Sequence, residues 1–484
     1  MRARARRCQR TQRAPGMENS CDILVTNASA VIPKVGVVEC DIAIEDGRIK
    51  TLKPSQNASA SRKINAAGKY VLPGAIDPHV HYGVYTPIDE AARTESRSAA
   101  VGGVTTMMRM LRLYDSDYRA VERQLAASRG AHCIDYAIHA SILRKEQVKD
   151  IPYLKKKGIN SLKIYMNLGA DLNHIYMDLE PGEHGVKDGE VNMDDSLLSA
   201  IVEGGAKEHS TILVHAENPA VCAEHIRRGK EKGMTGLKAW SDCRPAQSEA
   251  ESVAKVSALG RKFGANLYFV HIGSNAALDA ILAERQKGNA NYYIETCPQY
   301  LTHTYDFASM TGKVVPPIRS KSDVQSVWSA LRNGIIDTVG TDHVANRLDI
   351  KMGNGDLWSA LAGFPGIATM LPVLLDRGVN GDRIGIERVA EITSYNAARI
   401  FGMYPRKGTI QQGSDADIVM VDMDLEQKVT PELLQSYSDY TIYDGWRLKG
   451  WPVLTMVRGR VVMEAGQVAQ DALGHGQFVA RLPS

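Results

Sequence analysis

The middle of the chain repeats one pattern, a short apolar strand followed by an amphipathic helix, and this repeat restricts the fold more than any other feature. Strand-like segments occur at residues 70–73, 104–108, 135–140, 161–166, 211–216, 266–271, 291–296 and 338–342. Helical segments are expected at 89–101, 148–157, 194–209, 249–263, 276–286 and 323–333. Strands that alternate with helices indicate a parallel sheet. Eight strands predict an α/β chain folded as a (β/α)8 TIM-like barrel over residues 73–404.

The alternative for this pattern is a doubly wound open sheet, which binds nucleotides where its strand order reverses. Such a site requires a glycine-rich turn that holds phosphate groups. Neither GxGxxG nor GxxxxGK[ST] follows any of the strand segments. The barrel is therefore favoured.

The two ends of the chain differ from its middle, because short alternating strands occur there without a helical period. Segments 23–26, 41–45 and 48–52 precede the barrel sequence, and segments 416–422 and 454–463 follow it. The two termini of a domain commonly lie close together. We therefore expect residues 17–72 plus 405–484 to form one small β-sandwich domain.

Composition excludes several classes of protein. The hydrophobic fraction of 44% supports a large core, and a net charge of +3 gives no basic face for nucleic acid. Seven widely spaced cysteines form no disulfide framework, which favours a reducing cytoplasm, and no run of 18 apolar residues predicts a membrane helix. Residues 1–16 are expected to be a disordered extension, since segment 1–15 is rich in arginine and lacks acidic residues.

Potential metal ligands stand at the ends of the strand segments. His79 and His81 are one residue apart, so an extended backbone places both imidazoles on the same side. Each later candidate has an ordinary alternative, since a lone histidine is often a hydrogen-bonded core residue and an aspartate often caps a helix. A parallel barrel, however, brings the carboxyl ends of its strands to one mouth. The sequence therefore predicts one site built from His79, His81, Lys163, His215, His271 and Asp342.

Several longer motifs surround these residues. They are GAIDPHVH at 74–81, GINSLKI at 158–164, VHAEN at 214–218, VHIGS at 270–274, GTDH at 340–343, ETCPQYL at 295–301, VPPIR at 315–319 and KGTIQQGSDAD at 407–417. With these motifs the chain, from Met17 to its carboxyl end, resembles the hydantoinase and dihydropyrimidinase family of cyclic amidohydrolases.

The resemblance implies two divalent metal ions, one held by His79, His81, Lys163 and Asp342 and the other by Lys163, His215 and His271. An unmodified ammonium group cannot bind a cation, so the resemblance also implies that CO2 carboxylates Lys163 to N6-carboxylysine. Imidazole and carboxylate ligands suit Zn2+, although Mn2+, Fe2+ or Co2+ would fit.

The implied activity is hydrolysis of C–N bonds other than peptide bonds, here the opening of a cyclic amide such as a hydantoin, a dihydropyrimidine or a related ureide or imide. A hydroxide between the ions attacks the carbonyl carbon, and Asp342 transfers the proton to the leaving nitrogen. The resemblance further implies a small-molecule substrate, no nucleic-acid or membrane partner, and a homo-oligomer, either tetramer or dimer.

Two positions depart from the family pattern. Leu168 stands where the D-selective enzymes carry a tyrosine that stabilises the oxyanion, and Ala362 stands in place of a substrate-binding asparagine. Both are still expected to contact substrate. These departures favour an L-selective hydantoinase or an allantoinase. A dihydroorotase-like enzyme is less favoured, because Tyr82 and Gly83 follow His81 where an arginine is expected. A non-catalytic scaffold is opposed by the complete ligand set.

Overall fold

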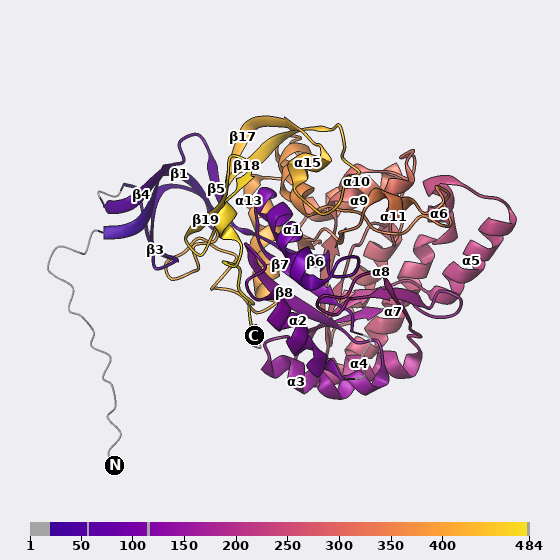
Figure 1. Ribbon diagram of the computed structural model, residues 1–484. Helices are drawn as coiled ribbons and strands as arrows, with labels where there is room; N and C mark the ends of the chain where they lie inside the picture. The colour runs from indigo at the N-terminus through magenta and orange to yellow at the C-terminus, as the bar shows by residue number, and fades with distance from the viewer. Residues whose placement is uncertain (1–19, 56–57, 114–116, 482–484) are drawn as a thin grey trace, which may run out of the picture.

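A computed structural model describes residues 20–55, 58–113 and 117–481 (Figure 1). The extension expected at residues 1–16 lies outside the described residues. Within those ranges, no helix has both the length and the apolar character needed to span a membrane.

The barrel sheet consists of parallel strands in the order β15-β14-β13-β12-β9-β8-β7-β6-β16. Strand β15 is the start of the predicted eighth strand, whereas β16 follows the end of that prediction. The two strands pair with β14 and β6 respectively, which closes the barrel. The bounds of the strands are β6 (Ala75–His81), β7 (Val104–Leu111), β8 (Asp135–Ser141), β9 (Ser161–Tyr165), β12 (Thr211–His215), β13 (Asn266–Phe269), β14 (Asn291–Thr296), β15 (Thr338–Val339) and β16 (His343–Val344).

Helices cover the outside of this sheet. The side chain of Asp194 accepts a hydrogen bond from the Leu197 backbone N–H at the start of α4, and a left-handed Gly264 ends α7. The predicted helices therefore form within a few residues of their expected bounds, whereas α2, α5 and α6 were not predicted. The main helices are α1 (Ile88–Val101), α2 (Val121–Ser128), α3 (Ile151–Lys156), α4 (Asp195–Lys207), α5 (Pro219–Glu231), α6 (Gly236–Cys243), α7 (Ala246–Phe263), α8 (Asn275–Arg285) and α10 (Lys321–Arg332).

The first predicted barrel strand, residues 70–73, belongs to a different sheet, and this corrects the expectation. It forms β5 (Tyr70–Pro73), which pairs with β1 and β17. The first strand of the barrel is β6, which contains both His79 and His81. Alternation along β6 still places the two imidazoles on one side.

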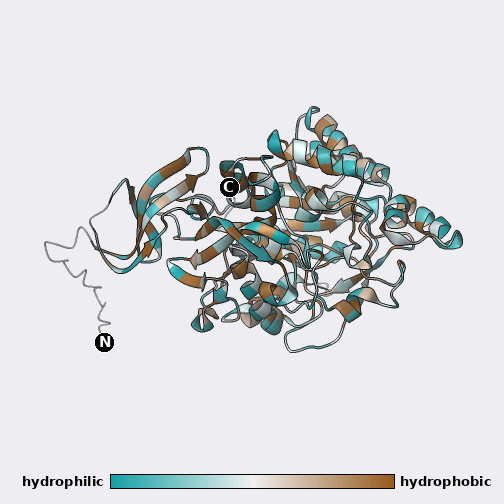
Figure 2. Ribbon diagram, turned by 90° about the horizontal axis from the view of Figure 1, so that it is seen from above, coloured by the Kyte–Doolittle hydropathy of each residue, from teal (hydrophilic) through white to brown (hydrophobic). Residues whose placement is uncertain are grey.

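Strands from both ends of the chain form the second sheet, in the order β20-β19-β18-β17-β5-β1-β2-β3 with β4 paired to β1. Figures 1 and 2 show it as a strand-rich lobe beside the helix-covered barrel. The fold class, a TIM-like barrel with a small β-sandwich, is confirmed, while the exact domain boundaries stay a prediction. The bounds are β1 (Ser20–Ile32), β2 (Gly36–Glu45), β3 (Arg48–Lys53), β4 (Ser59–Asn65), β17 (Ile418–Lys428), β18 (Arg447–Val457), β19 (Arg460–Glu464) and β20 (Gln467–Val468).

A buried ion cluster joins the barrel to the carboxyl-terminal strands. The Nζ of Lys407 lies 2.7 Å from Asp135, at the start of β8, and 2.5 Å from Asp417, which precedes β17. Asp415 is 3.3 Å away, so three carboxylates surround this one ammonium group. The charge of Lys407 offsets the cost of burying them.

We predict that Lys407→Met destabilises the protein by about 3–5 kcal/mol, because it leaves buried carboxylates without this cation. The measurement is the free energy of unfolding, or the thermal midpoint if unfolding is irreversible. Lys449→Met is the matched control, since Lys449 forms an exposed pair with Asp424 at 3.0 Å, and its loss should change stability by less than about 1 kcal/mol. Equal effects of the two substitutions would contradict the prediction.

Candidate metal centre and pocket

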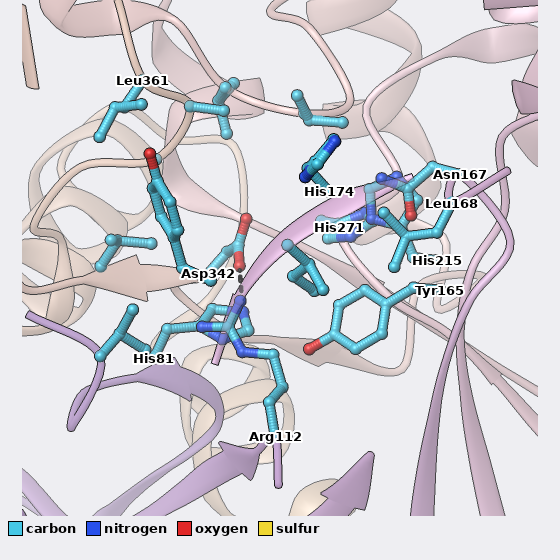
Figure 3. Close-up of a pocket in the computed structure, with 18 of the residues that line it drawn as sticks. His81, Arg112, Tyr165, Asn167, Leu168, His174, His215, His271, Asp342 and Leu361 are labelled. Atoms are coloured by element: carbon cyan, nitrogen blue, oxygen red, sulfur yellow. Dashed lines mark ion pairs between the residues drawn. The ribbon is translucent and has the colours of Figure 1, made fainter. Parts of the chain in front are cut away.

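A cavity of about 400 Å³ opens at the carboxyl ends of the barrel strands. It collects side chains from β6, β9 and β12 and from the turns that follow β13 and β15 (Figure 3). All the predicted site residues line this one cavity: His79, His81, Lys163, Leu168, His215, His271, Asp342 and Ala362.

The first cluster in the cavity consists of His79, His81 and Asp342. The Oδ1 of Asp342 lies 3.2 Å from the Nε2 of His79 and 3.0 Å from the Nε2 of His81. Potential ligand atoms of the three residues all lie within 4.8 Å of one another. Burial lowers the pKa of both histidines well below its usual value, so both imidazoles are neutral and have a lone pair for a cation.

The second cluster consists of Lys163, His215 and His271. The ring centroids of His215 and His271 are 4.5 Å apart, and those of His79 and His271 are 5.4 Å apart, so the two clusters adjoin. The Nζ of Lys163 is buried without a hydrogen-bond partner among the described residues. Burial lowers the pKa of this amine to about 8, so a neutral amine is accessible near physiological pH.

The backbone at two of these positions adopts a conformation that side chains other than glycine rarely take. His271 has a φ of 44° and Asp342 a φ of 52°. Residues held in the left-handed region cluster at functional sites, because the surrounding structure must maintain the strained geometry. Both residues lie in turns after barrel strands, and both line the cavity.

Two buried carboxylates orient the imidazoles. The Nδ1 of His79 lies 2.8 Å from Glu295 on β14, and the Nε2 of His215 lies 2.6 Å from Glu217. Each contact occupies one ring nitrogen and leaves the other for a ligand, an arrangement usual for histidines that bind metals. Neither glutamate was predicted to have a role, although both lie within the quoted motifs.

The donor set fits a divalent metal. Buried polar atoms without hydrogen-bond partners among the described residues are rare in folded proteins, yet the Nδ1 of His81, the Nδ1 of His271 and the Nζ of Lys163 all have this property at one cavity. Neutral imidazoles and a carboxylate are suitable ligands for such an ion.

The model of the amidohydrolase family matches residues 70–462. This chain belongs to the amidohydrolase family. It is 33% identical to the L-hydantoinase of Paenarthrobacter aurescens over 95% of this chain and 98% of that protein, and 30% identical to the D-hydantoinase of Rhizobium radiobacter over 95% and 99%. The solved structure of "L-Hydantoinase (Dihydropyrimidinase) from Arthrobacter aurescens" has a TM-score of 0.86 at 32% identity, covering 95% of this chain and 100% of that one. The predicted resemblance is confirmed.

Other histidines of this amidohydrolase take different roles. His343 is buried but does not line the cavity, and its Nε2 contacts Glu95 at 2.9 Å. His174 is at the rim of the cavity, where its Nδ1 lies 2.8 Å from Asp188. His184 is exposed and does not line the cavity.

Two side chains in the cavity wall carry unused polar atoms. The hydroxyl of Tyr165, two residues after Lys163, is buried without a hydrogen-bond partner among the described residues, and so is the Nε of Arg112. Neither Tyr165 nor Arg112 was among the predicted site residues. The sequence pointed to a site role for Arg112 only through its position, because it is a cationic residue directly after strand β7.

We predict that Glu295→Gln lowers the affinity for divalent metal by about 10- to 100-fold, because the carboxamide beside His79 cannot take up the negative charge that a bound cation favours on Glu295. The measurement is the metal retained by the protein in competition with a chelator. Glu95→Gln is the matched control, since it alters the same kind of contact on His343, outside the cavity. Unchanged metal retention in Glu295→Gln would refute the positioning role.

Proposed function

We propose that this protein is a binuclear metal-dependent hydrolase that opens a cyclic amide, either a hydantoin, a dihydropyrimidine or a related cyclic ureide or imide. The observation that carries the proposal is the convergence of all six predicted ligands on one cavity of the barrel. The relatives named as hydantoinases, aligned over 95% of the chain, support the same substrate class.

We assign His79, His81, Lys163 and Asp342 to one ion and Lys163, His215 and His271 to the other, with Lys163 carboxylated by CO2. The buried Lys163 amine has no hydrogen-bond partner in the part of the chain that the structure describes, and carboxylation would replace a costly buried cation by an anion with two oxygens. Divalent ions held there, most simply Zn2+ with Mn2+, Fe2+ or Co2+ as alternatives, supply a water of lowered pKa and a polarised carbonyl.

Asp342 is the proposed catalytic residue. Its carboxylate faces the cavity and is 10% exposed, so it can contact both water and substrate. As water adds to the ring carbonyl, Asp342 takes the proton and delivers it to the amide nitrogen when the C–N bond breaks. The products are a carboxylate and the freed nitrogen group on one open chain.

Tyr165 is the proposed hydrogen-bond donor to the developing oxyanion. The D-selective enzymes use a tyrosine at the position of Leu168 for this purpose, and leucine has no hydroxyl. Burial raises the pKa of Tyr165 to about 12, which keeps its hydroxyl protonated. Figure 3 shows this hydroxyl directed toward the centre of the cavity. Leu168 and Ala362 line the same cavity and would contact the substrate ring through apolar atoms and backbone groups.

An allantoinase is the alternative within the same chemistry, and a dihydroorotase-like enzyme is a further one. A non-catalytic scaffold is opposed by the complete set of ligands at the cavity. A cytoplasmic location and assembly into a tetramer or dimer stay predictions.

We predict that the metal-loaded protein hydrolyses at least one member of a panel of hydantoins, dihydrouracil, allantoin, dihydroorotate and succinimide. Ring opening is followed by chromatography, with the stereochemistry of the product recorded. Asp342→Asn is the control: it should retain metal, yet lower kcat by about 100- to 10,000-fold because the proton carrier is lost. No turnover of any cyclic amide by a metal-loaded protein would refute the proposed function.

We also predict that Lys163→Ala loses bound metal and activity, because the carbamate oxygens that carboxylated Lys163 would offer as ligands are gone. Added acetate or propionate should restore part of both, since the truncated side chain leaves space for a carboxylate. Lys163→Arg is the matched control, because it fills that space with a cation and cannot be rescued. Metal content is measured by elemental analysis, and full occupancy in Lys163→Ala would show that Lys163 is not a ligand.

A further inference from the structure

The cavity wall contains an arginine that neither the metal site nor the proposed reaction uses. Arg112 follows the last residue of β7, is 9% exposed and lines the cavity. Its Nε is buried without a hydrogen-bond partner among the residues that the structure describes. Figure 3 shows the guanidinium group directed toward the side of the cavity that holds His81 and Asp342.

The carboxylate nearest to Arg112 is already occupied. The Nε of Arg112 lies 4.0 Å from Oδ2 of Asp178, beyond hydrogen-bond distance. Asp178 instead accepts hydrogen bonds from the Arg109 side chain, at 3.0 Å from Nε and also from Nη2, and from the Arg112 backbone N–H at 2.6 Å. One carboxylate thus faces two guanidinium groups. The neutral Gln124, which also contacts Arg109, does not balance the remaining charge.

Tyr85, Tyr165 and His81 line the cavity with Arg112, and none of them carries a carboxylate. Burial raises the pKa of Tyr85 to about 12, with Arg112 opposing the shift, so this hydroxyl stays protonated. The carboxylates among the described lining residues are Asp342, which is assigned to the metal, and the exposed Asp171. Arg112 therefore has a net positive charge and unused donors in a largely desolvated wall.

We propose that Arg112 binds a carboxylate carried by the substrate, so that the preferred substrate is a cyclic amide with an anionic substituent. This rests on the proposed function. The planar guanidinium fork matches a carboxylate, and a charge-assisted contact in a desolvated wall is among the stronger polar interactions. The carboxylate that ring opening itself creates forms at the attacked carbonyl, beside the proposed metal ligands. Arg112 thus determines specificity and takes no part in bond cleavage.

Two probes of nearly equal size test the proposal. They are 5-carboxymethylhydantoin, which carries a carboxylate, and 5-carbamoylmethylhydantoin, which carries a neutral carboxamide at the same position. We expect the wild-type protein to show the lower KM for the acid. Arg112→Gln should raise that KM by about 10- to 100-fold and leave kcat/KM for the amide within about threefold of its wild-type value. Arg112→Lys should retain part of the preference, since it keeps the charge but loses the fork.

Equal losses on both probes in Arg112→Gln would overturn the proposal, because they would indicate a structural or oxyanion role. Absence of an acid preference in the wild-type protein would overturn it as well.

Calorimetric binding of the same probes separates this inference from the proposed function. Preferential binding of the acid that depends on Arg112, without hydrolysis of either probe, would support the carboxylate subsite and count against the hydrolase. If both probes are hydrolysed and Arg112→Gln binds them with the same affinities as the wild-type protein, the hydrolase is supported and the carboxylate subsite is overturned.

Discussion

The buried carboxylate of Glu295 is the contact on which the mouth of the barrel depends. It lies 2.8 Å from the Nδ1 of His79 on β6, accepts a hydrogen bond of 2.8 Å from the hydroxyl of Tyr268 on β13, and accepts one of 3.0 Å from the backbone N–H of His271. Glu295 itself is on β14, so a single side chain connects three strands. Burial raises its pKa to about 8, against the effect of these hydrogen bonds. A cation held by the histidines would favour the ionised form and strengthen the network.

The same principle of paired buried charge recurs away from the cavity. Glu217 contacts both His215 and Arg244, and Lys407 lies among the carboxylates at the domain junction. Each of these groups would be costly to bury alone, so each fixes the relative positions of the elements that carry it. Such networks suit a site whose imidazoles must be held still before a metal or a substrate binds.

Arg112 and Lys163 depart from this principle, and both line the cavity. Among the described residues, neither has a carboxylate within hydrogen-bond distance, whereas Arg109, Arg244 and Lys407 do. A buried donor that the fold leaves unused is a destabilising feature, and its retention at a cavity points to a partner from outside the chain. For Lys163 we assign CO2 and metal, and for Arg112 an anionic part of the substrate.

The sequence by itself predicted the barrel, six of its helices and the six proposed ligand positions, because hydrophobic period and motif are local properties of the chain. It assigned residues 70–73 to the wrong sheet, since an apolar tetrapeptide does not specify which neighbours it will pair with. The roles of Glu295 and Glu217, the unpaired hydroxyl of Tyr165 and the surplus charge of Arg112 were decided only by the tertiary structure. Each depends on which groups, distant in sequence, come within hydrogen-bond distance in a space that excludes water. The proposed metal ligands can therefore be read from the chain, whereas the charge proposed to select a substrate becomes visible only when the strands have closed around it.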